Sequence, residues 1–352
     1  MFPPSPSPGI RRRRFAITLA AGAAALSSPA LLAQGKPEKA RVNLALGGKT
    51  SLYYMPLAVA AHLGFFHAEG LEVNVTDFAG GSLALAALAA GSVDIAGGAY
   101  EHTIAQQGQG QPLQAFVMFG RAPQIVLGVS GRTMGGLRTL HELRGRRIGI
   151  SAPGSSTQLL AALVLRGFGL TKGDVQYVGV GTGPSALNAL RNREIDAISS
   201  VETVMTALQQ KSEVRIVADT RSLSGTRTLF GGPMPGGCLY APAEFVQKHP
   251  ATCQALANGV VHALKWLRTA GPADIIQAVP ESYLGGDRAT YLSAFANVSE
   301  AFSIDGTLSE ESARTALTVV STLEGRSRAG RVDLAQTYNN EFARRARERF
   351  RV

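Results

Sequence analysis

Small polar residues follow strand-like runs at six places in the chain, where their hydroxyl and backbone N–H groups could bind a small solute. The six junctions are Gly48–Ser51, Gly80–Ser82, Gly97–Tyr100, Pro153–Thr157, Gly181–Ser185 and Ser199–Glu202. In an open parallel sheet, ligands bind beyond the carboxyl ends of the strands, where helix starts offer unpaired N–H groups and suit anions. One such serine alone would be a helix cap worth about 1 kcal/mol. Several of them, spread over both halves of the chain, predict a cleft.

Motifs of nucleotide binding and catalysis are incomplete. The Gly47–Thr50 segment would need a glycine at position 43, where the chain has asparagine, and Gly179–Pro184 has proline where a dinucleotide fingerprint has its last glycine. The patterns Gly-x-Ser-x-Gly and His-Glu-x-x-His are missing from the sequence, and its six histidines are scattered. We therefore expect no enzyme activity, no cofactor and no metal site, although a triad assembled in space stays open.

The cysteine content excludes a protein held together by a disulfide framework, and the distribution of charge argues against a nucleic-acid-binding protein. Cys238 and Cys253 are interpreted as buried thiols, with one disulfide as the alternative if their Cα atoms lie within about 7 Å. The formal charge is +10, of which Arg11–Arg14 contribute four in a segment that we expect to be removed. The arginines of residues 344–351 indicate the solvated face of a last helix, without the interleaved aromatic residues of a nucleic-acid surface. No nucleic-acid partner is expected.

The first 33 residues read as an export signal of the twin-arginine type. Arg12-Arg13-Arg14-Phe15 matches the twin-arginine pattern, in which two arginines are followed by any residue and then phenylalanine. About a dozen apolar residues follow, too few to span a membrane. Cleavage is expected after Ala33. The mature protein should then be soluble and periplasmic.

The rest of the chain alternates β-branched runs with helical patterns, which indicates parallel β–α–β units. Strands are expected at 41–46, 71–75, 93–96, 113–119, 125–129, 147–150, 175–178, 195–199 and 214–218, with helices at 55–63, 82–90, 100–107, 156–168, 185–191 and 202–211. Residues 222–237 are expected to form a loop before a helical C-terminal part. The pattern predicts two α/β lobes, with hinge crossings near 129–132 and 228–237.

The stretch Ser51–Ala60, continued by Leu63–Phe66 and Glu69–Val73, resembles the nitrate-, sulfonate- and taurine-type solute-binding proteins, a family also similar to thiamine-pyrimidine synthase. Further matches follow in the same order at Gly91–Ala96, Leu143–Gly149, Ser155–Thr157, Ala186–Leu190 and Glu194–Ala197. The synthases of this family carry a cysteine-rich motif, which this chain lacks.

The resemblance implies a type II periplasmic-binding-protein fold of the α/β class, with two doubly wound lobes joined by a two-crossing hinge. Residues 41–130 and 237–352 would form lobe 1, and residues 131–236 would form lobe 2. It also implies an ABC permease as partner and a monomeric receptor that closes around its solute.

The candidate ligand-binding residues lie at the junctions of both lobes. They are Thr50, Ser51, Tyr53, Ser82 and Tyr100 in lobe 1, Ser155, Ser156, Thr157 and Glu202 in lobe 2, and Arg121 near the first crossing. Arg121 could face a carboxylate or sulfonate, or form a surface salt bridge. Glu202 could hold the amine of a taurine-like solute, or simply begin its helix.

The leading hypothesis is a receptor for a small organic anion such as an alkanesulfonate, taurine or a carboxylate. A thiamine-pyrimidine precursor or nitrate stays open as the solute. A periplasmic sensor subunit and an exported enzyme with a cofactor are the alternatives from other classes.

Overall fold

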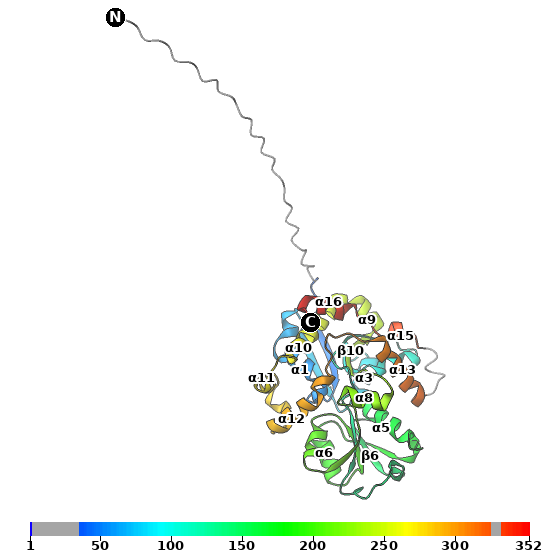
Figure 1. The fold of residues 1–352 in the computed structure, drawn as a ribbon. Coiled ribbons are helices and arrows are strands. Elements are labelled where there is room, and N and C mark those ends of the chain that lie inside the picture. Colours follow the sequence, from blue (N-terminus) through cyan, green and yellow to red (C-terminus); the bar gives the residue numbers. More distant parts are fainter. Residues whose placement is uncertain (2–34, 325–331) are drawn as a thin grey trace. The chain divides into compact units, whose positions relative to one another are not determined.

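The computed structural model describes Met1, residues 35–324 and residues 332–352. The predicted signal peptide, apart from Met1, falls outside the described residues. Residues Lys36–Val352 form one compact unit, built around two sheets of five strands each (Figure 1). Within the described part of the chain, no helix is both long and apolar enough to cross a membrane.

The first sheet has the strand order β2-β1-β3-β10-β4. Its strands are β1 (Arg41–Gly47), β2 (Glu72–Phe78), β3 (Ile95–Ala99), β4 (Leu113–Met118) and β10 (Gly237–Pro242). The strand β10 is antiparallel to both of its neighbours, β3 and β4, whereas β1 pairs in parallel with β2 and β3. We call the part of the molecule built on this sheet lobe 1.

The second sheet has the order β7-β6-β8-β5-β9 and defines lobe 2. Its strands are β5 (Val126–Ser130), β6 (Arg147–Ile150), β7 (Gln176–Gly179), β8 (Ala197–Ser200) and β9 (Val214–Asp219). Again one strand, β5, is antiparallel to both of its neighbours. In each lobe the antiparallel strand is therefore the one that the chain enters directly after crossing from the other lobe.

The first crossing lies earlier in the chain than the sequence analysis placed it. Residues 126–130 were assigned to lobe 1, but β5 pairs with β8 and β9 in the second sheet. The chain therefore crosses between β4 and β5, over residues 119–125. An apolar strand such as Val126–Ser130 fits either core, which is why its composition did not reveal its partner.

Helices cover both faces of each sheet. They are α1 (Met55–His62), α2 (Phe65–Ala68), α3 (Gly81–Ala89), α4 (Glu101–Gly108), α5 (Ser156–Arg166), α6 (Pro184–Arg191), α7 (Val204–Gln210), α8 (Leu223–Phe230), α9 (Ala243–Lys248), α10 (Pro250–Leu267), α11 (Pro272–Gln277), α12 (Arg288–Val298), α13 (Glu310–Glu324), α15 (Leu334–Thr337) and α16 (Glu341–Phe350). Short 3-10 turns occur at Leu52–Tyr54, Leu140–Leu143, Lys172–Asp174, Glu281–Tyr283 and Ser299–Ala301.

The strand side chains of lobe 1 alternate between two cores, as the two-residue period of a strand requires. Leu44 and Leu239 pack with α1, α10 and α16 on one face, while Ala45 and Tyr240 pack with α3, α4 and α13 on the other. Helix α10 is buried along almost its whole length, and each fully buried leucine or valine there contributes about 1.5–3 kcal/mol.

The chain crosses back to lobe 1 between β9 and β10. Residues 222–237, expected to be a loop, contain α8, whose start is capped by the Ser222 hydroxyl accepting from Gly225 N–H at 3.0 Å. Both cysteines are free and buried, which confirms the interpretation of Cys238 and Cys253 as thiols.

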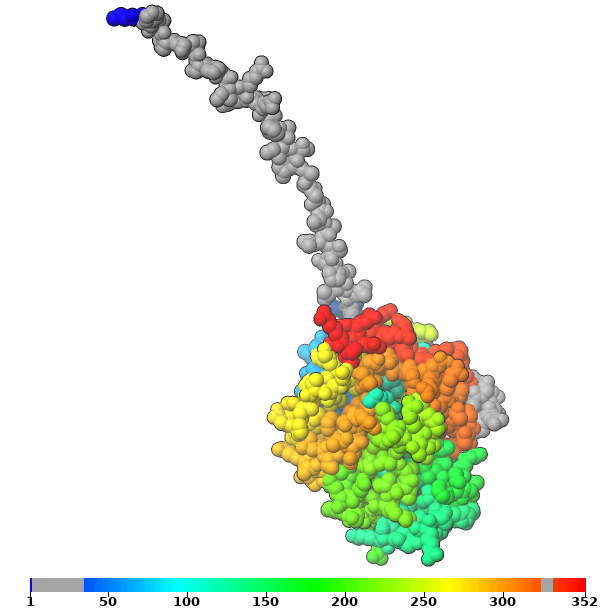
Figure 2. Space-filling view, viewed as in Figure 1, coloured from blue at the N-terminus to red at the C-terminus, as the bar shows by residue number. Residues whose placement is uncertain are grey.

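C-terminal helices of lobe 1 also contact lobe 2. In Figure 2 the orange segments around residues 290–310 lie directly against the green surface of lobe 2. The contacts include α12 with α7, where Asn297 donates to the Thr206 hydroxyl at 2.9 Å, and α13 with α5. The lobes therefore meet along more than the hinge.

Candidate functional site

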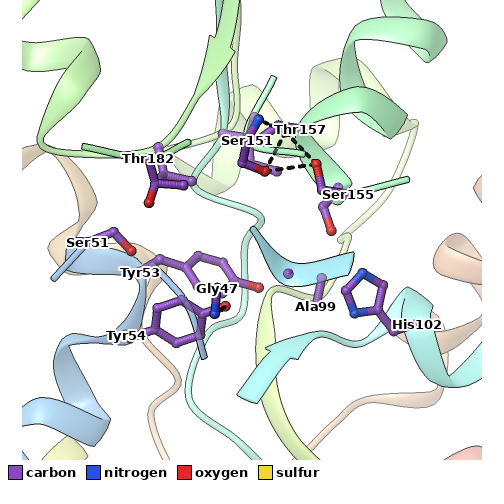
Figure 3. Close-up of a pocket in the computed structure, with 14 residues that line it drawn as sticks. Gly47, Ser51, Tyr53, Tyr54, Ala99, His102, Ser151, Ser155, Thr157 and Thr182 are labelled. Atoms are coloured by element: carbon purple, nitrogen blue, oxygen red, sulfur yellow. Dashed lines mark hydrogen bonds between the residues drawn. The ribbon is translucent and has the colours of Figure 1, made fainter. Parts of the chain in front are cut away.

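A pocket lies between the lobes, where the carboxyl ends of β1, β3 and β6 meet the starts of α3 and α5. It is lined from lobe 1 by Gly47, Ser51, Tyr53, Tyr54, Gly81, Ala99 and His102, and otherwise by Ile125, Ser151, Ser155, Ser156, Thr157, Thr182 and Val201 (Figure 3). The pocket is small: the volume open to the centre of a water molecule is about 40 Å³, which leaves room for only a few atoms. The two lobes thus lie close together across this cleft.

Lobe 2 contributes a cluster of three linked hydroxyls. Ser151 directly follows β6, and its hydroxyl donates to the Ser155 hydroxyl at 2.8 Å. Thr157 Oγ1 lies 3.0 Å from Ser151 Oγ and 2.7 Å from Ser155 Oγ. The backbone N–H of Ser151 also donates to Thr157 Oγ1 at 2.9 Å. None of these hydroxyls caps α5, so the first N–H groups of this helix stay available for a polar solute.

Two of the buried polar atoms of lobe 1 that have no hydrogen-bond partner among the described residues, Ser51 Oγ and His102 Nε2, belong to residues that line the pocket. The other ring nitrogen of His102 lies 3.0 Å from the Tyr240 hydroxyl. Burial lowers the pKa of His102 to about 4, so its ring is neutral at pH 7. Unsatisfied buried polar atoms are costly, and both residues line the pocket, where a solute would pair with them.

Five of the ten predicted residues line this pocket: Ser51, Tyr53, Ser155, Ser156 and Thr157. Ser82 lies beside it, and its hydroxyl donates to the Pro153 carbonyl at 2.8 Å, directly joining the two lobes. Thr50 precedes Ser51 in the chain but does not line the pocket.

Three predicted residues, Tyr100, Arg121 and Glu202, have their side chains bonded to partners outside this pocket. The Tyr100 hydroxyl is buried 2.6 Å from Thr337 Oγ1, inside lobe 1. Arg121 donates through Nε to the Glu300 carbonyl at 2.8 Å and lines a separate pocket with α8 and residues 303–312.

Glu202, proposed to hold a ligand amine, already has a cationic partner. Its carboxylate accepts from Arg221 Nη1 at 2.6 Å and from Thr206 N–H at 2.9 Å. Its backbone carbonyl instead faces lobe 1 and accepts from Leu52 N–H at 3.2 Å. The sequence could not reveal this pairing because Arg221 follows 19 residues later, after β9.

Sequence reasoning missed Glu101, His102, Ser151 and Thr182. Glu101 and His102 directly follow the Gly97–Tyr100 junction, which was the one signal available for them. Glu101 is buried on the first turn of α4. Burial raises the pKa of this carboxyl.

The lobes also approach closely at the Gly48 turn. Gly48 has a φ of +92°, and a Cβ placed there would lie 1.9 Å from Thr182 Oγ1 of lobe 2. The turn is held by Asp77, whose carboxylate accepts from Gly48 N–H at 3.1 Å and from Lys49 N–H at 2.7 Å. Glycine is thus needed here both for its backbone conformation and for the space.

Two α/β lobes, each with one antiparallel crossover strand, and a polar pocket between them define the type II periplasmic-binding-protein fold. The family model described as "NMT1/THI5 like" matches residues 51–270. The chain belongs to this family, as the sequence resemblance predicted.

Solved structures share the fold of this chain. A protein from Bordetella bronchiseptica RB50 is 46% identical with a TM-score of 0.88, over 90% of this chain and 100% of that one. The alkanesulfonate-binding protein from Xanthomonas axonopodis pv. citri, bound to MOPS, shares the fold at 19% identity, with a TM-score of 0.66 over 86% of this chain and 98% of that chain. These likenesses confirm the predicted fold.

A curated relative has an enzyme name. The 4-amino-5-hydroxymethyl-2-methylpyrimidine phosphate synthase of Schizosaccharomyces pombe is 27% identical over 216 residues. The match covers 59% of this chain and only 60% of the synthase's own length.

Proposed function

We propose that this chain is an exported receptor that captures a small solute between its lobes and delivers it to an ABC importer, without catalysing a reaction. The observation that carries the proposal is the pocket, on which polar groups of both lobes converge. A solute that contacts both lobes only in the closed arrangement shifts the hinge equilibrium by its differential affinity. A transport receptor needs only to bind its solute and close around it, so the site requires no catalytic group.

Alkanesulfonates, taurine and small carboxylates are the solutes that we favour. The hydroxyl cluster and the start of α5 can donate to oxygen-rich groups, and the Xanthomonas protein of the same fold is an alkanesulfonate-binding protein. Nitrate, for which we expected an arginine-bearing cleft, is disfavoured because none of the described residues that line the pocket is lysine or arginine.

A pyrimidine precursor of thiamine is the second candidate solute, because the curated relative is named for the synthesis of such a compound. We propose binding rather than synthesis, since both cysteines are buried outside the pocket lining. Mass spectrometry after incubation should therefore recover each candidate solute unchanged. A sensor role would be indicated by a neighbouring kinase gene, and transport by neighbouring permease and ATPase genes.

Thermal unfolding of residues 34–352 against sulfonates, taurine, carboxylates, nitrate and thiamine precursors tests the proposal. A solute at about 1,000 times its Kd should stabilise the protein by about 4 kcal/mol, which raises the midpoint by several degrees. A rise with one chemical class supports the proposal. Flat curves over the whole panel, for protein refolded to remove carried-over solute, would contradict the solute classes named here.

A further inference from the structure

A further pocket lies at the crossings between the lobes and is larger than the pocket of the cleft. The volume open to the centre of a water molecule is about 350 Å³, against about 40 Å³ in the cleft, and small-molecule sites typically have about 300–1,000 Å³. The two pockets have no lining residue in common. We call this space the hinge pocket, and its lining includes Gly120, Arg121, Leu223, Arg227, Ile304 and Ser312.

Three segments of the chain form the walls of the hinge pocket. The first crossing contributes Arg121, helix α8 of the second crossing contributes Leu223 and Arg227, and residues 303–312 of lobe 1 form the third wall. Helix α8 lies between the lobes in Figure 1, and its Leu229 packs against the core of lobe 2. A molecule in the hinge pocket therefore touches lobe 1 and its connection to lobe 2 at once.

Two arginines give the hinge pocket positive charge. Arg121 is held by its Nε, which donates to the Glu300 carbonyl at 2.8 Å, and no ion pair among the described residues includes Arg121. The acidic partner of Arg227 is Glu311, 3.9 Å away, and both of these side chains are more than half exposed. Both guanidinium groups can therefore donate to an anion that enters the pocket.

The acid that lines the hinge pocket is already occupied. Asp305 Oδ1 accepts from the N–H of Thr307 at 3.0 Å and from its hydroxyl at 2.7 Å, and Oδ2 accepts from Arg347 Nη1 at 3.2 Å. The nearby Glu300 carboxylate accepts from the Leu223 N–H at 2.7 Å. The charge of Asp305 is thus balanced by Arg347, and the two lining arginines stay available.

Apolar and hydroxyl groups share the rest of the lining. Ile304 is 47% exposed, although it is a large apolar side chain, and it lines the pocket with Leu223 and Leu308. At the start of α13 the hydroxyls of Ser309 and Ser312 lie 2.8 Å apart, so one of their two protons is left for another acceptor. The pocket therefore places an apolar surface beside positive charge and a hydroxyl donor.

We propose that the hinge pocket is a second binding site, separate from the solute cleft, and that it takes a small amphipathic carboxylate. The carboxylate lies between Arg121 and Arg227, whose planar guanidinium groups suit oxyanions, and the aliphatic body lies against Leu223 and Ile304. Because Arg121 belongs to lobe 1 and Arg227 to α8, the bound molecule bridges segments that move apart when the hinge opens. It therefore stabilises the arrangement of the lobes described here. This site goes beyond the proposed function and does not depend on it.

Isothermal titration of the mature chain with three probes tests the chemistry of the site. Hexanoate is compared with hexanamide, which keeps the aliphatic body without the charge, and with acetate, which keeps the charge without most of the body. Hexanoate should bind at least about tenfold more tightly than hexanamide because of its charged hydrogen bonds. It should exceed acetate by a similar factor, since each buried CH₂ contributes about fourfold. Equal binding of hexanoate and either comparison probe, or no binding of hexanoate at millimolar concentration, would overturn the proposal.

Variants of the two arginines locate the charge that is recognised. Arg121→Gln should weaken hexanoate about tenfold and the exposed Arg227→Gln about threefold, with the affinity for hexanamide unchanged in both. Arg166→Gln is the matched control, because Arg166 is an exposed arginine of α5 outside the pocket. If Arg121→Gln does not fold, Arg227→Gln still decides, since its side chain is exposed. Unchanged hexanoate affinity in the pocket variants that fold would contradict the proposal.

Crystals soaked with 6-bromohexanoate separate the hinge pocket from the cleft. Anomalous scattering should place the bromine against Leu223 and Ile304. Bromine found only in the cleft, near Ser51 and Ser155, would overturn the second site and leave the receptor proposal standing. Conversely, flat thermal curves over the solute panel would count against the receptor proposal and leave the hinge pocket untouched, so the two proposals fail separately.

Discussion

Glu101 and His102 are neighbours in sequence whose pKa values are shifted in opposite directions by the same cause. Burial disfavours the charged form of each, so the pKa of the acid rises and that of the imidazole falls to about 4. Near pH 7 the histidine therefore contributes hydrogen bonds rather than charge to the pocket. The two side chains consequently respond differently when the solution is acidified.

The first prediction concerns stability in acid. Because the unfolded His102 has a pKa near 6.5 and the folded one near 4, the unfolded state binds more protons between these values. Its contribution to stability is complete above about pH 6.5 and is lost as the pH falls to about 4, with a magnitude of about 3 kcal/mol. Urea unfolding at several pH values should show this loss in the wild type, relative to His102→Gln. Parallel curves for the two proteins would contradict it.

The second prediction compares two arginines. Arg221→Leu leaves the Glu202 carboxylate buried without its partner, so we expect a loss of about 3–5 kcal/mol in unfolding free energy. Arg227→Leu is the matched control, because Arg227 and Glu311 are both exposed and 3.9 Å apart, a pair worth about 0–1 kcal/mol. Urea unfolding measures both variants. Equal losses would show that the buried pair has no special role.

At the scale of elements, the turn from β6 into α5 organises much of the lobe 2 surface of the pocket. Its three hydroxyls bond to one another and to the Ser151 N–H instead of capping the helix. The turn is therefore kept rigid by side chains, while the first N–H groups of α5 remain open toward the cleft.

The third prediction tests this turn. Thr157→Val keeps the shape of the side chain but leaves the buried Ser151 N–H without its acceptor, which should cost about 1–3 kcal/mol and weaken solute binding. Thr318→Val on the exposed face of α13 removes only a bond to the Arg314 carbonyl within its own helix, and should change neither. Urea unfolding and solute titration report the two effects. An unaffected Thr157→Val would contradict the rigid-turn argument.

The elements themselves were largely predictable, since β-branched runs and helical periods specify strands and helices locally. Ser155, Ser156 and Thr157, which were candidates because they start a helix at the carboxyl end of a strand, line the pocket. The helix α8 was missed because its sequence, Leu223–Phe230, is followed by the glycine- and proline-rich residues 231–237. For Tyr100, Arg121 and Glu202 the side-chain direction depends on distant partners such as Thr337 and Arg221, which no local pattern encodes.

At the scale of the whole molecule, function in our proposal depends on the lobes coming together, and they approach each other closely at the Gly48 turn. The position of β5 could not be predicted from sequence, because strand composition does not record which sheet a strand joins. The interlobe contacts between Gly48 and Thr182, and between Ser82 and Pro153, were equally hidden, since they arise only when the two lobes meet.

The fourth prediction tests closure. Gly48→Ala strains a backbone with φ of +92° by about 1–2 kcal/mol and places a Cβ against Thr182, so the closed cleft should be disfavoured and solute affinity should fall at least about tenfold. Gly64→Ala is the control, because Gly64 has a φ of +75° but open space around it. Titration should show an affinity loss only for Gly48→Ala. Equal affinities would mean that this contact does not limit closure.

The central position of β10 has a consequence for how the chain is made. All strands of the second sheet lie between residues 126 and 219, so lobe 2 can assemble as soon as that stretch has been synthesised. The first sheet cannot close until residues 237–242 arrive and separate β3 from β4. Until then two apolar strands keep unpaired edges, the kind of surface through which nascent chains aggregate. Lobe 1 is therefore the first part of the molecule to be synthesised and the last to be completed.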